Sequence, residues 1–328
     1  MTIPFFLRLV GTVCIGVLML DAGAAHAAYP ERPVHIVVPF PPGGGTDVIA
    51  RVLAQKLSAG FAQQVVVENR PGAGAMIGAD HVAKALPDGY TLLLGTSAEL
   101  TISPGLYDNV PYDPVADFAP IDLLGTTPIV LVAHPTFPAN RLDTLIEQAR
   151  QSPGRIAIGS GGQGAAPDLA AELLRRLTGI DVIIVPYKGA GDALTDVVAG
   201  QVGATFTTVA GALPLTRSGS IKALAIIAAQ RSTLMPDVPS AAEQGVPDYE
   251  VVTWFGLFAP AKTPHAVIDT LATAVAAAMR DPEIAARLVK LGIEPSAAAP
   301  DGEGLRRRIA TEAARWRRLI HDAGIKPE

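Results

Sequence analysis

Short runs of β-branched and aliphatic residues alternate along the chain with segments whose apolar residues recur at helical spacing. The first unit has an apolar run at 34–40, small residues at 41–45, and then helical spacing. Strands are predicted at 34–40, 65–67, 91–94, 129–133, 155–158, 182–185, 205–208, 223–227 and 251–259. Helices are predicted at 48–57, 77–84, 142–150, 168–177, 193–199, 266–280, 283–291 and 303–323. This alternation indicates an α/β protein built from βαβ units.

The alternating pattern occurs twice, which predicts two lobes, each a mostly parallel sheet flanked by helices. We expect lobe one to span 28–128 plus 252–328, and lobe two to span 129–251. The proline-rich stretch 104–135 and the segment around 251–254 are interpreted as crossings between the lobes. The uncharged stretch 197–216 contains glycines and threonines, so we interpret it as a buried strand with loops and not as a membrane span.

Residues 1–27 have the pattern of a secretory signal peptide. Arg8 is the positive residue, 9–20 is the apolar region, and Ala25-His26-Ala27 is a small-residue cleavage site. We expect cleavage after Ala27 and a periplasmic mature chain. The chain has a single cysteine, Cys14 within this segment, so the mature chain would have no thiol.

Charge and motif content exclude several classes of function. The chain has 26 Lys and Arg against 31 Asp and Glu, a formal net charge of −5, without the basic blocks that nucleic-acid binding requires. It contains no G-x-S-x-G, H-E-x-x-H or P-loop sequence, and its histidines are scattered singly. We therefore expect no enzyme activity, no metal site, no cofactor and no nucleic-acid partner.

One motif leaves an enzymatic alternative open. Residues 159–164 fit G-x-G-x-x-G between a predicted strand and a predicted helix, and Asp181 follows. This context is typical of a dinucleotide site. However, the motif lies in mid-chain, and Asp181 precedes the next strand instead of ending it. An exported nucleotide-binding α/β enzyme therefore remains the second hypothesis.

Small polar turns follow most of the predicted strands. They lie at 41–47, 95–101, 159–164, 187–191 and 207–208. In open α/β sheets, ligands bind beyond the carboxyl ends of the strands. Glycines let backbone N–H groups approach a ligand, and helix N-termini present unpaired donors with partial positive charge. Together these turns predict a cleft for a small anion, typically a carboxylate.

Several ordered stretches carry a family resemblance. They are YPERP at 29–33, VPFPPGGGTD at 38–47, VENRPGAG at 67–74, PDGYT at 87–91, VPYKG at 185–189 and FGLFAPAKTP at 255–264. On these stretches the chain resembles the Bug-type extracytoplasmic solute-binding proteins of tripartite tricarboxylate transporters. The resemblance implies a two-lobed periplasmic-binding-protein (flytrap) fold that encloses one small organic acid. It implies delivery of that acid to membrane permease subunits, and we expect a monomer. A sensor subunit for a membrane receptor is a further alternative.

The resemblance also implies a set of ligand-binding residues. In lobe one these are Phe40, Gly45, Thr46, Asp47, Thr96 and Ser97. In the facing lobe they are Ser160, Gly161, Tyr187, Gly189 and Thr208.

Three acidic residues depart from the family pattern. They are Glu99, Asp168 and Asp192. If they lie near the mouth of the cleft, their charges would oppose a di- or tricarboxylate and favour a ligand with one carboxylate or an amine. Alternatively, they point to solvent as residues of helix N-termini.

Overall fold

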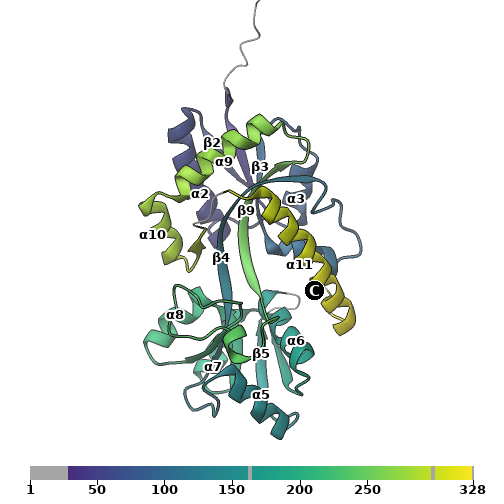
Figure 1. The fold of residues 1–328 in the computed structure, drawn as a ribbon, viewed down its shortest axis with the longest axis vertical. Coiled ribbons are helices and arrows are strands. Elements are labelled where there is room, and N and C mark those ends of the chain that lie inside the picture. Colours follow the sequence, from purple (N-terminus) through teal and green to yellow (C-terminus); the bar gives the residue numbers. More distant parts are fainter. Residues whose placement is uncertain (1–28, 162–164, 297–299, 327–328) are drawn as a thin grey trace, which may run out of the picture.

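The computed structural model describes residues 29–161, 165–296 and 300–326 and shows two halves stacked along the long axis (Figure 1). The strands are β1 (Val34–Val38), β2 (Val65–Asn69), β3 (Thr91–Thr96), β4 (Phe118–Ala133), β5 (Ala157–Gly161), β6 (Ile183–Tyr187), β7 (Ala204–Thr208), β8 (Lys222–Ile226), β9 (Val252–Pro260) and β10 (Glu294–Pro295). The α-helices are α2 (Gly45–Phe61), α3 (Met76–Ala83), α4 (Ser103–Leu106), α5 (Leu142–Gln151), α6 (Ala166–Thr178), α7 (Ala190–Val198), α8 (Val209–Arg217), α9 (His265–Met279), α10 (Pro282–Lys290) and α11 (Gly302–Ala323). A π-helix, η1 (Ala98–Ile102), and a 3-10 helix, η2 (Ala242–Gln244), complete the described elements.

In the upper half, β1 pairs in parallel with both β2 and β3. Helices cover both faces of this block, which explains why β1 is a nearly continuous apolar run. Ile36 and Val38 pack into the core formed with α2 and α9. Val37, on the opposite face, packs into the core formed with α3 and α11. The alternation of side chains along the strand therefore fills two cores at once.

The lower half repeats this arrangement. β5 pairs in parallel with β6 and β7. Ile129 and Leu131 pack into a core shared with α5 and α6. Val130 and Val132, between them on β4, pack into the core beside α7 and α8. Each half thus has a parallel block of three strands with helices on both faces.

Two long strands join the halves into one hydrogen-bonded sheet, in the order β2-β1-β3-β9-β4-β7-β5-β6. β4 runs through both halves, pairing antiparallel with β9 over 118–128 and with β7 over 129–133. At the junction, the Ile129 amide donates to the Val251 carbonyl at 3.2 Å. Since β3 is also antiparallel to β9, the strands of the upper block run toward the lower half. The strands of the lower block run toward the upper half, so the carboxyl ends of both blocks face each other.

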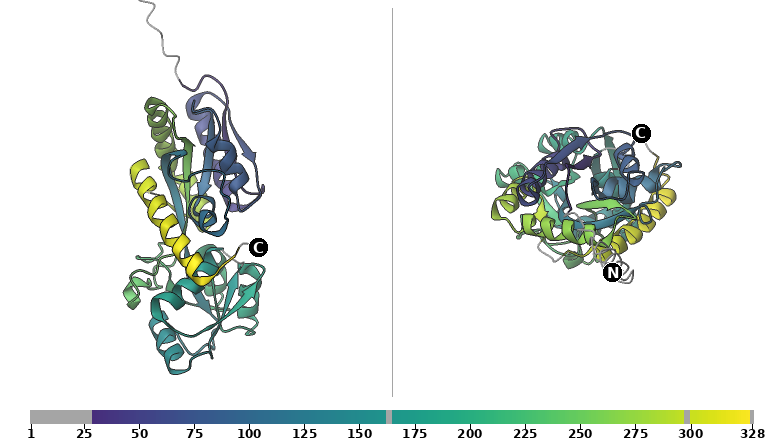
Figure 2. Two further views of the ribbon diagram at one scale, coloured as in Figure 1. Left: turned by 90° about the vertical axis from the view of Figure 1, so that its right-hand side faces the viewer. Right: turned by 90° about the horizontal axis from the view of Figure 1, so that it is seen from above.

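Helix α11 contacts both halves. It runs down the flank of the upper half and ends against the lower half (Figure 2). Its buried Trp316, Leu319 and Ile320 pack into the core that contains α5 and α6. A salt bridge between Arg176 of α6 and Asp322 of α11, at 2.7 Å, lies at the same contact.

The structure confirms the α/β fold class and nearly all predicted elements. Three longer segments differ from the sequence predictions, besides the short β10 and η2, which were not predicted. Residues 118–128, for which no strand was predicted, form the first part of β4, whose register shifts between Pro120 and Asp122. Residues 209–217, interpreted as strand and loops, form α8 although Pro214 lies inside the helix. Residues 98–106, assigned to no element, form η1 and α4. Among the described helices, none is long and apolar enough to cross a membrane.

Candidate functional site

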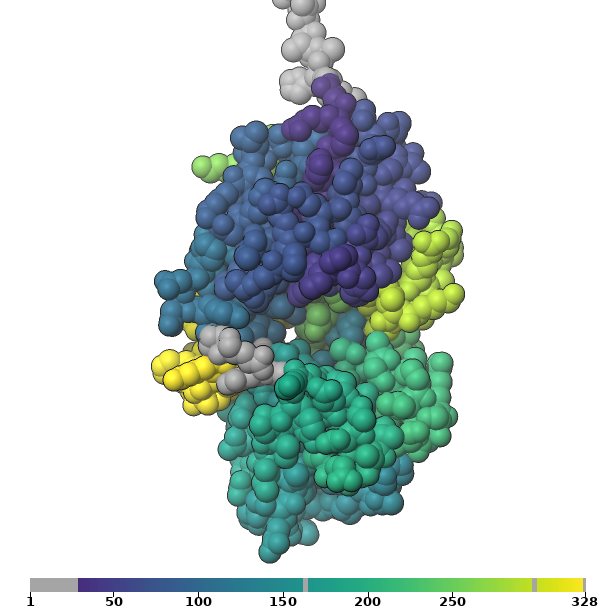
Figure 3. Space-filling model, turned by 180° about the vertical axis from the view of Figure 1, so that it is seen from behind, coloured from purple at the N-terminus to yellow at the C-terminus, as the bar shows by residue number. Residues whose placement is uncertain are grey.

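A cavity of about 630 Å³ lies where the carboxyl ends of the two blocks face each other. From behind, the space-filling surface is hollowed between the purple-blue upper half and the teal-green lower half (Figure 3). The upper half lines the cavity with Pro39, Phe40, Pro41, Pro71, Gly72, Gly74, Ala75, Ser97, Ala98, Ile102, Ser103, Leu106 and Tyr107. Ala165 and Ala166, where α6 begins, line it from the lower half, and Thr253 of β9 lines it at the junction.

The loop after β1 is held by a buried carboxylate. Asp47 accepts hydrogen bonds from the Gly43 amide, from Nδ2 of Asn69 and from Nε of Arg51, each at 2.9 Å. Asn69 Nδ2 also donates to the Phe40 carbonyl at 3.1 Å. The hydrogen bond from Arg51, with those from Gly43 and Asn69, lowers the pKa of Asp47 to about 2. Asp47 therefore fixes the shape of the loop that carries Phe40, and both of its carboxylate oxygens already accept hydrogen bonds within the protein.

A second buried carboxylate organises the turn after β3. Glu99 accepts from the Thr96 amide at 2.5 Å and from the Thr96 hydroxyl at 2.7 Å. Burial raises the pKa of Glu99 to about 7, because the charged form loses its hydration. Thr96 thus points its hydroxyl into the protein, whereas the adjacent Ser97 lines the cavity. Thr101 donates its hydroxyl to the Ser97 carbonyl at 2.6 Å, which holds the turn in place.

In the lower half, the polar side chains predicted to bind ligand are engaged within the protein. Ser160 donates to Asp168 at 2.5 Å. The Tyr187 hydroxyl donates to Asp196 at 2.8 Å, and this hydrogen bond raises the pKa of Tyr187. The Thr208 hydroxyl accepts from the Gly211 amide at 3.2 Å and caps α8.

The glycines of β5 are explained by close packing. A Cβ added to Gly161 would lie 2.4 Å from the Ala190 Cα, at the start of α7. A Cβ added to Gly159 would lie 3.2 Å from the Ala193 Cβ. These glycines therefore let α7 approach β5, a role that needs no nucleotide. The rest of the G-x-G-x-x-G motif, 162–164, lies outside the described residues.

Three predicted residues lie at helix N-termini. Gly45 and Thr46 begin α2, whose N-cap Gly44 has no side chain to cap it. Gly189 is the N-cap of α7, and it also offers no side-chain cap. Helix N-termini of this kind leave backbone N–H donors available to an anion. Neither terminus contributes to the lining of the cavity.

Of the eleven predicted site residues, Phe40 and Ser97 line the cavity. The other nine lie outside its lining, and the binding role of all eleven stays a prediction. The apolar wall formed by Ile102, Leu106 and Tyr107 was not predicted, because apolar residues that line a cavity have the same sequence pattern as core residues.

The three acidic departures have different surroundings. Glu99 has no exposed surface, so it does not point to solvent, and its effect on a ligand in the cleft stays a prediction. Asp168 is hydrogen-bonded to Ser160 and lies in the first turn of α6. Asp192 is exposed in the first turn of α7, where the helix dipole favours a negative charge.

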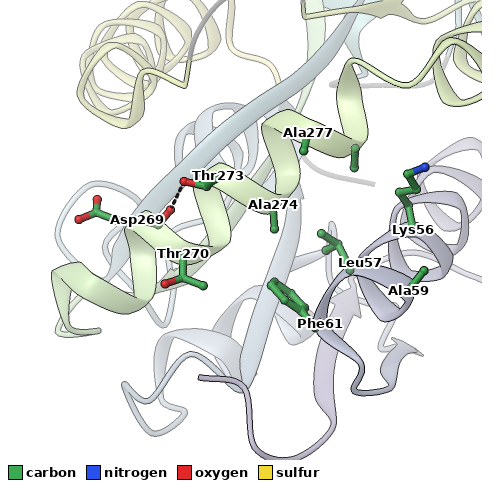
Figure 4. Close-up of a pocket in the computed structure, with 11 residues that line it drawn as sticks. Lys56, Leu57, Ala59, Phe61, Asp269, Thr270, Thr273, Ala274 and Ala277 are labelled. Carbon is green, nitrogen blue, oxygen red and sulfur yellow. Dashed lines mark hydrogen bonds between the residues drawn. The ribbon is translucent and has the colours of Figure 1, made fainter. Parts of the chain in front are cut away.

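A larger groove of about 800 Å³ lies elsewhere, between α2 and α9 (Figure 4). Leu57 and Phe61 of α2 face Ala274 and Ala277 of α9 across it. It lies at the end of α2 opposite to Gly45, so it is remote from the facing strand ends. The described residues contain no group of three or more His, Cys, Asp or Glu that could hold a metal ion.

The comparison with known proteins gives the family. The model of the tripartite tricarboxylate transporter family receptor matches residues 49–325. The chain belongs to this family. Protein BugT from Bordetella pertussis is 39% identical over 317 residues, which cover 95% of this chain and 97% of BugT.

Solved structures of other proteins resemble this receptor over most of its length. A protein from R. palustris solved with adipate is 35% identical, with a TM-score of 0.72 over 92% of this chain and 100% of that chain. MatC from Rhodopseudomonas palustris, solved with bound malate, is 34% identical, with a TM-score of 0.70 over 89% of this chain and 100% of that chain. The periplasmic binding protein BugD is 35% identical, with a TM-score of 0.70. The family resemblance and the fold class are thus confirmed.

Proposed function

We propose that this chain is a periplasmic solute-binding protein that captures a small organic acid between its two halves and delivers it to a membrane permease. The observation that carries the proposal is the cavity between the facing carboxyl ends of the two parallel blocks. The relatives solved with adipate and malate both hold carboxylates. Such a protein binds and releases its ligand unchanged, so we propose no catalytic activity.

Binding would work through contacts with both halves. The uncapped N-termini of α2 and α7 offer backbone donors at Gly45, Thr46 and Gly189, and Ser97 offers a hydroxyl at the cavity. A ligand that touches both halves stabilises the closed arrangement more than the open one, and only this difference in affinity shifts the equilibrium. A hydrogen bond to a charged group contributes about 1.5–3 kcal/mol, so a few such bonds would suffice for micromolar binding.

The remaining features of the proposal concern the mature protein. Residues 1–27, which lie outside the described residues, would be a signal peptide that is removed after Ala27. N-terminal sequencing of the exported protein tests this. Lobe one would comprise 28–128 plus 252–328, and lobe two 129–251. The mature protein would be a monomer, which light scattering after gel filtration measures directly.

A thermal-shift screen of organic acids and nucleotides tests the function. An acid at about a hundredfold excess over its Kd should stabilise the folded protein by about 2.7 kcal/mol. We expect stabilisation by at least one carboxylate and none by NAD or ATP. Stabilisation by a nucleotide and by no acid would overturn the proposal in favour of the exported enzyme.

Matched substitutions locate the site. Thr46→Asp and Ser97→Asp each place a negative charge where the carboxylate is proposed to bind, and should abolish acid binding. Thr273→Asp adds the same charge on an exposed position of α9, at the groove beside α2, and should leave affinity unchanged. Urea unfolding without ligand checks that each variant is folded. Unchanged affinity in a folded Thr46→Asp or Ser97→Asp variant would remove that residue from the site, and loss in Thr273→Asp would place the ligand in the groove.

A further inference from the structure

Among the described residues, four polar side chains line the cavity between the halves, and three of them have hydroxyls without a protein partner. Ser103 donates its hydroxyl to the Gly74 carbonyl at 2.9 Å. The hydroxyls of Ser97, Tyr107 and Thr253 make no hydrogen bond to any residue that the structure describes. A polar group on a cavity wall that has no protein partner bonds to water or to a ligand. These three hydroxyls are therefore the side-chain groups of the described wall that can bind a ligand.

Two of these hydroxyls, those of Ser97 and Thr253, come from neighbouring strands. β3 and β9 are paired antiparallel, and Thr96 opposite Phe255 is the pair nearest to the lower half. Ser97 follows Thr96 directly, and only 3% of its surface is exposed. Thr253 precedes Phe255 by two positions and is paired with Thr127 of β4, where the halves join. A ligand held by both hydroxyls therefore touches the strand that crosses between the halves.

The third hydroxyl, that of Tyr107, lies on another wall of the cavity. Tyr107 follows α4, and its ring packs against the core that contains α3 and α11. A Cβ built on Gly74 would lie 2.9 Å from Cε2 of Tyr107 and 3.2 Å from its hydroxyl oxygen. The phenol thus lies directly against the loop after β2, where a residue without a side chain leaves room for it. A ring held on two sides loses little entropy when its hydroxyl binds a ligand.

Apolar residues separate the two places. Ala98 and Ile102 of η1 and Leu106 of α4 line the cavity and lie between Ser97 and Tyr107 along the chain. A ligand that reaches both places therefore has two hydrogen-bonding groups joined by an apolar spacer. A site that hydrogen-bonds a ligand group discriminates against an analogue without that group, because its own polar atom is then left unpaired.

We propose that Thr253 and Tyr107 are ligand-binding residues, and that Tyr107 determines specificity. Thr253 donates to the carboxylate beside Ser97, and Tyr107 donates to a second hydrogen-bond-accepting group at the other end of the acid. Neither Thr253 nor Tyr107 is among the eleven site residues predicted from the sequence. The proposal rests on the proposed function, because it names further contacts, and the group that they select, at the same site.

Calorimetry on variants that lack a single hydroxyl tests the proposal. Tyr107→Phe keeps the ring against Gly74, and Thr253→Val keeps the size of the side chain. The probes are adipate with hexanoate and 4-hydroxybenzoate with benzoate, and in each pair only the first acid has the second group. Thr253→Val should weaken every probe that binds the native protein at least fivefold. Tyr107→Phe should weaken the acids with two groups at least fivefold and the acids with one group less than twofold.

Matched variants remove a hydroxyl elsewhere. Tyr90→Phe removes a hydroxyl that accepts from the Glu31 amide at 2.9 Å, and Thr273→Val removes one from the exposed side of α9. Neither position lines the cavity, so neither variant should change any affinity. Urea unfolding without ligand checks that every variant is folded.

Several results would overturn the inference and leave the proposed function intact. They are unchanged affinity in a folded Tyr107→Phe or Thr253→Val variant, equal losses for both members of a pair in Tyr107→Phe, and native binding of hexanoate or benzoate alone. Binding of none of the four probes would also overturn the inference. The proposed function would fall with it only if the wider screen of acids found no ligand either.

Discussion

Glu99 is a buried acid that directly follows Ala98, a residue that lines the cavity. Its carboxylate accepts two hydrogen bonds from Thr96 and has no exposed surface. Burial raises its pKa from 4.5 to about 7, which means that the folded protein binds its proton more tightly than the unfolded chain does. The stabilising effect of that proton is fully present below about pH 4.5 and is lost as the pH rises to about 7.

Glu99→Gln should therefore flatten the pH dependence of stability. In the native protein we expect the free energy of unfolding to fall between pH 5 and pH 7 by an amount of the order of 3 kcal/mol at most. The glutamine side chain has no proton to lose, so the free energy of unfolding of the variant should fall less over this pH range. Urea unfolding of the native protein and of the variant at pH 5, 6, 7 and 8 measures the difference. Burial also raises the pKa of Asp122 to about 6, so its deprotonation lowers the free energy of unfolding over the same pH range. The variant Asp122→Asn removes this second contribution and so separates it from that of Glu99. A Glu99→Gln curve parallel to that of the native protein would contradict the expectation.

Gly161 is required by the close approach of β5 and α7. Gly161→Ala places a Cβ 2.4 Å from the Ala190 Cα, and backbone must move to make room. We expect a loss of about 1–3 kcal/mol in the free energy of unfolding. Gly191→Ala is the matched control, because no atom lies within 4 Å of its added Cβ, and it should be neutral or slightly stabilising. Equal free energies of unfolding for the two variants would show that α7 can move away from position 161 without loss of stability.

The sequence could predict where the polar side chains at the strand ends lie, but not which partners they bind. Short hydroxyl and carboxyl side chains after apolar runs indicated polar turns at strand ends, and the structure places them there. However, Asp47 is held by Asn69, which is 22 positions away, and spacing along the chain cannot show this pairing. The partners of Ser160 and Tyr187 were hidden for the same reason, because the hydrogen bonds depend on how α6 and α7 pack on the sheet.

At the scale of elements, the loop after β1 and the start of α2 act as one unit. Asp47 ties the Gly43 amide and Asn69 of β2 to α2, so the loop that carries Phe40 has a fixed shape. Fixing a loop before binding reduces the entropy lost when a ligand binds. The uncapped N-terminus of α2 is thereby held in one position.

Asp47→Asn should weaken this unit. The amide side chain can accept from Gly43 but has no charge for Arg51, so we expect a loss of about 1–2 kcal/mol in the free energy of unfolding at pH 7 and weaker acid binding. The lowered pKa of Asp47 means that the carboxylate stabilises the fold above about pH 4, and this contribution is lost as the pH falls toward 2. Asp143→Asn removes an exposed pair with Arg141 and should cost less than about 1 kcal/mol without an effect on binding. Urea unfolding and calorimetry check both variants, and equal losses would contradict the role given to Asp47.

Elements with a clear apolar period were predictable, and those interrupted by proline were not. Pro120 and Pro128 lie in β4, and Pro214 lies in α8. Proline lowers the expectation of a strand or helix because it removes a donor. In β4, pairing with β9 on one side and β10 on the other outweighs this local effect. Pairing between strands that are distant in the chain cannot be predicted from a short stretch of sequence.

At the scale of the whole molecule, α11 couples the halves. It packs along the upper half and buries Trp316 in a core of the lower half. Trp316→Ala should cost about 3–5 kcal/mol in the free energy of unfolding, because it leaves a large void at that contact. Arg318→Ala, on an exposed position of the same helix, should cost less than about 0.5 kcal/mol. Denaturant unfolding measures both, and a loss below about 1 kcal/mol for Trp316→Ala would show that this contact does not couple the halves.

The pairing of β4 with β9 in the upper half and with β7 in the lower half also has a mechanical consequence. Two halves joined only by flexible loops could move freely, but here any narrowing of the space between them has to bend strands that are hydrogen-bonded to their neighbours. Because bending paired strands away from their resting geometry costs free energy, we expect this joint to oppose closure of the halves. The halves should therefore part again when no contact between them holds them together.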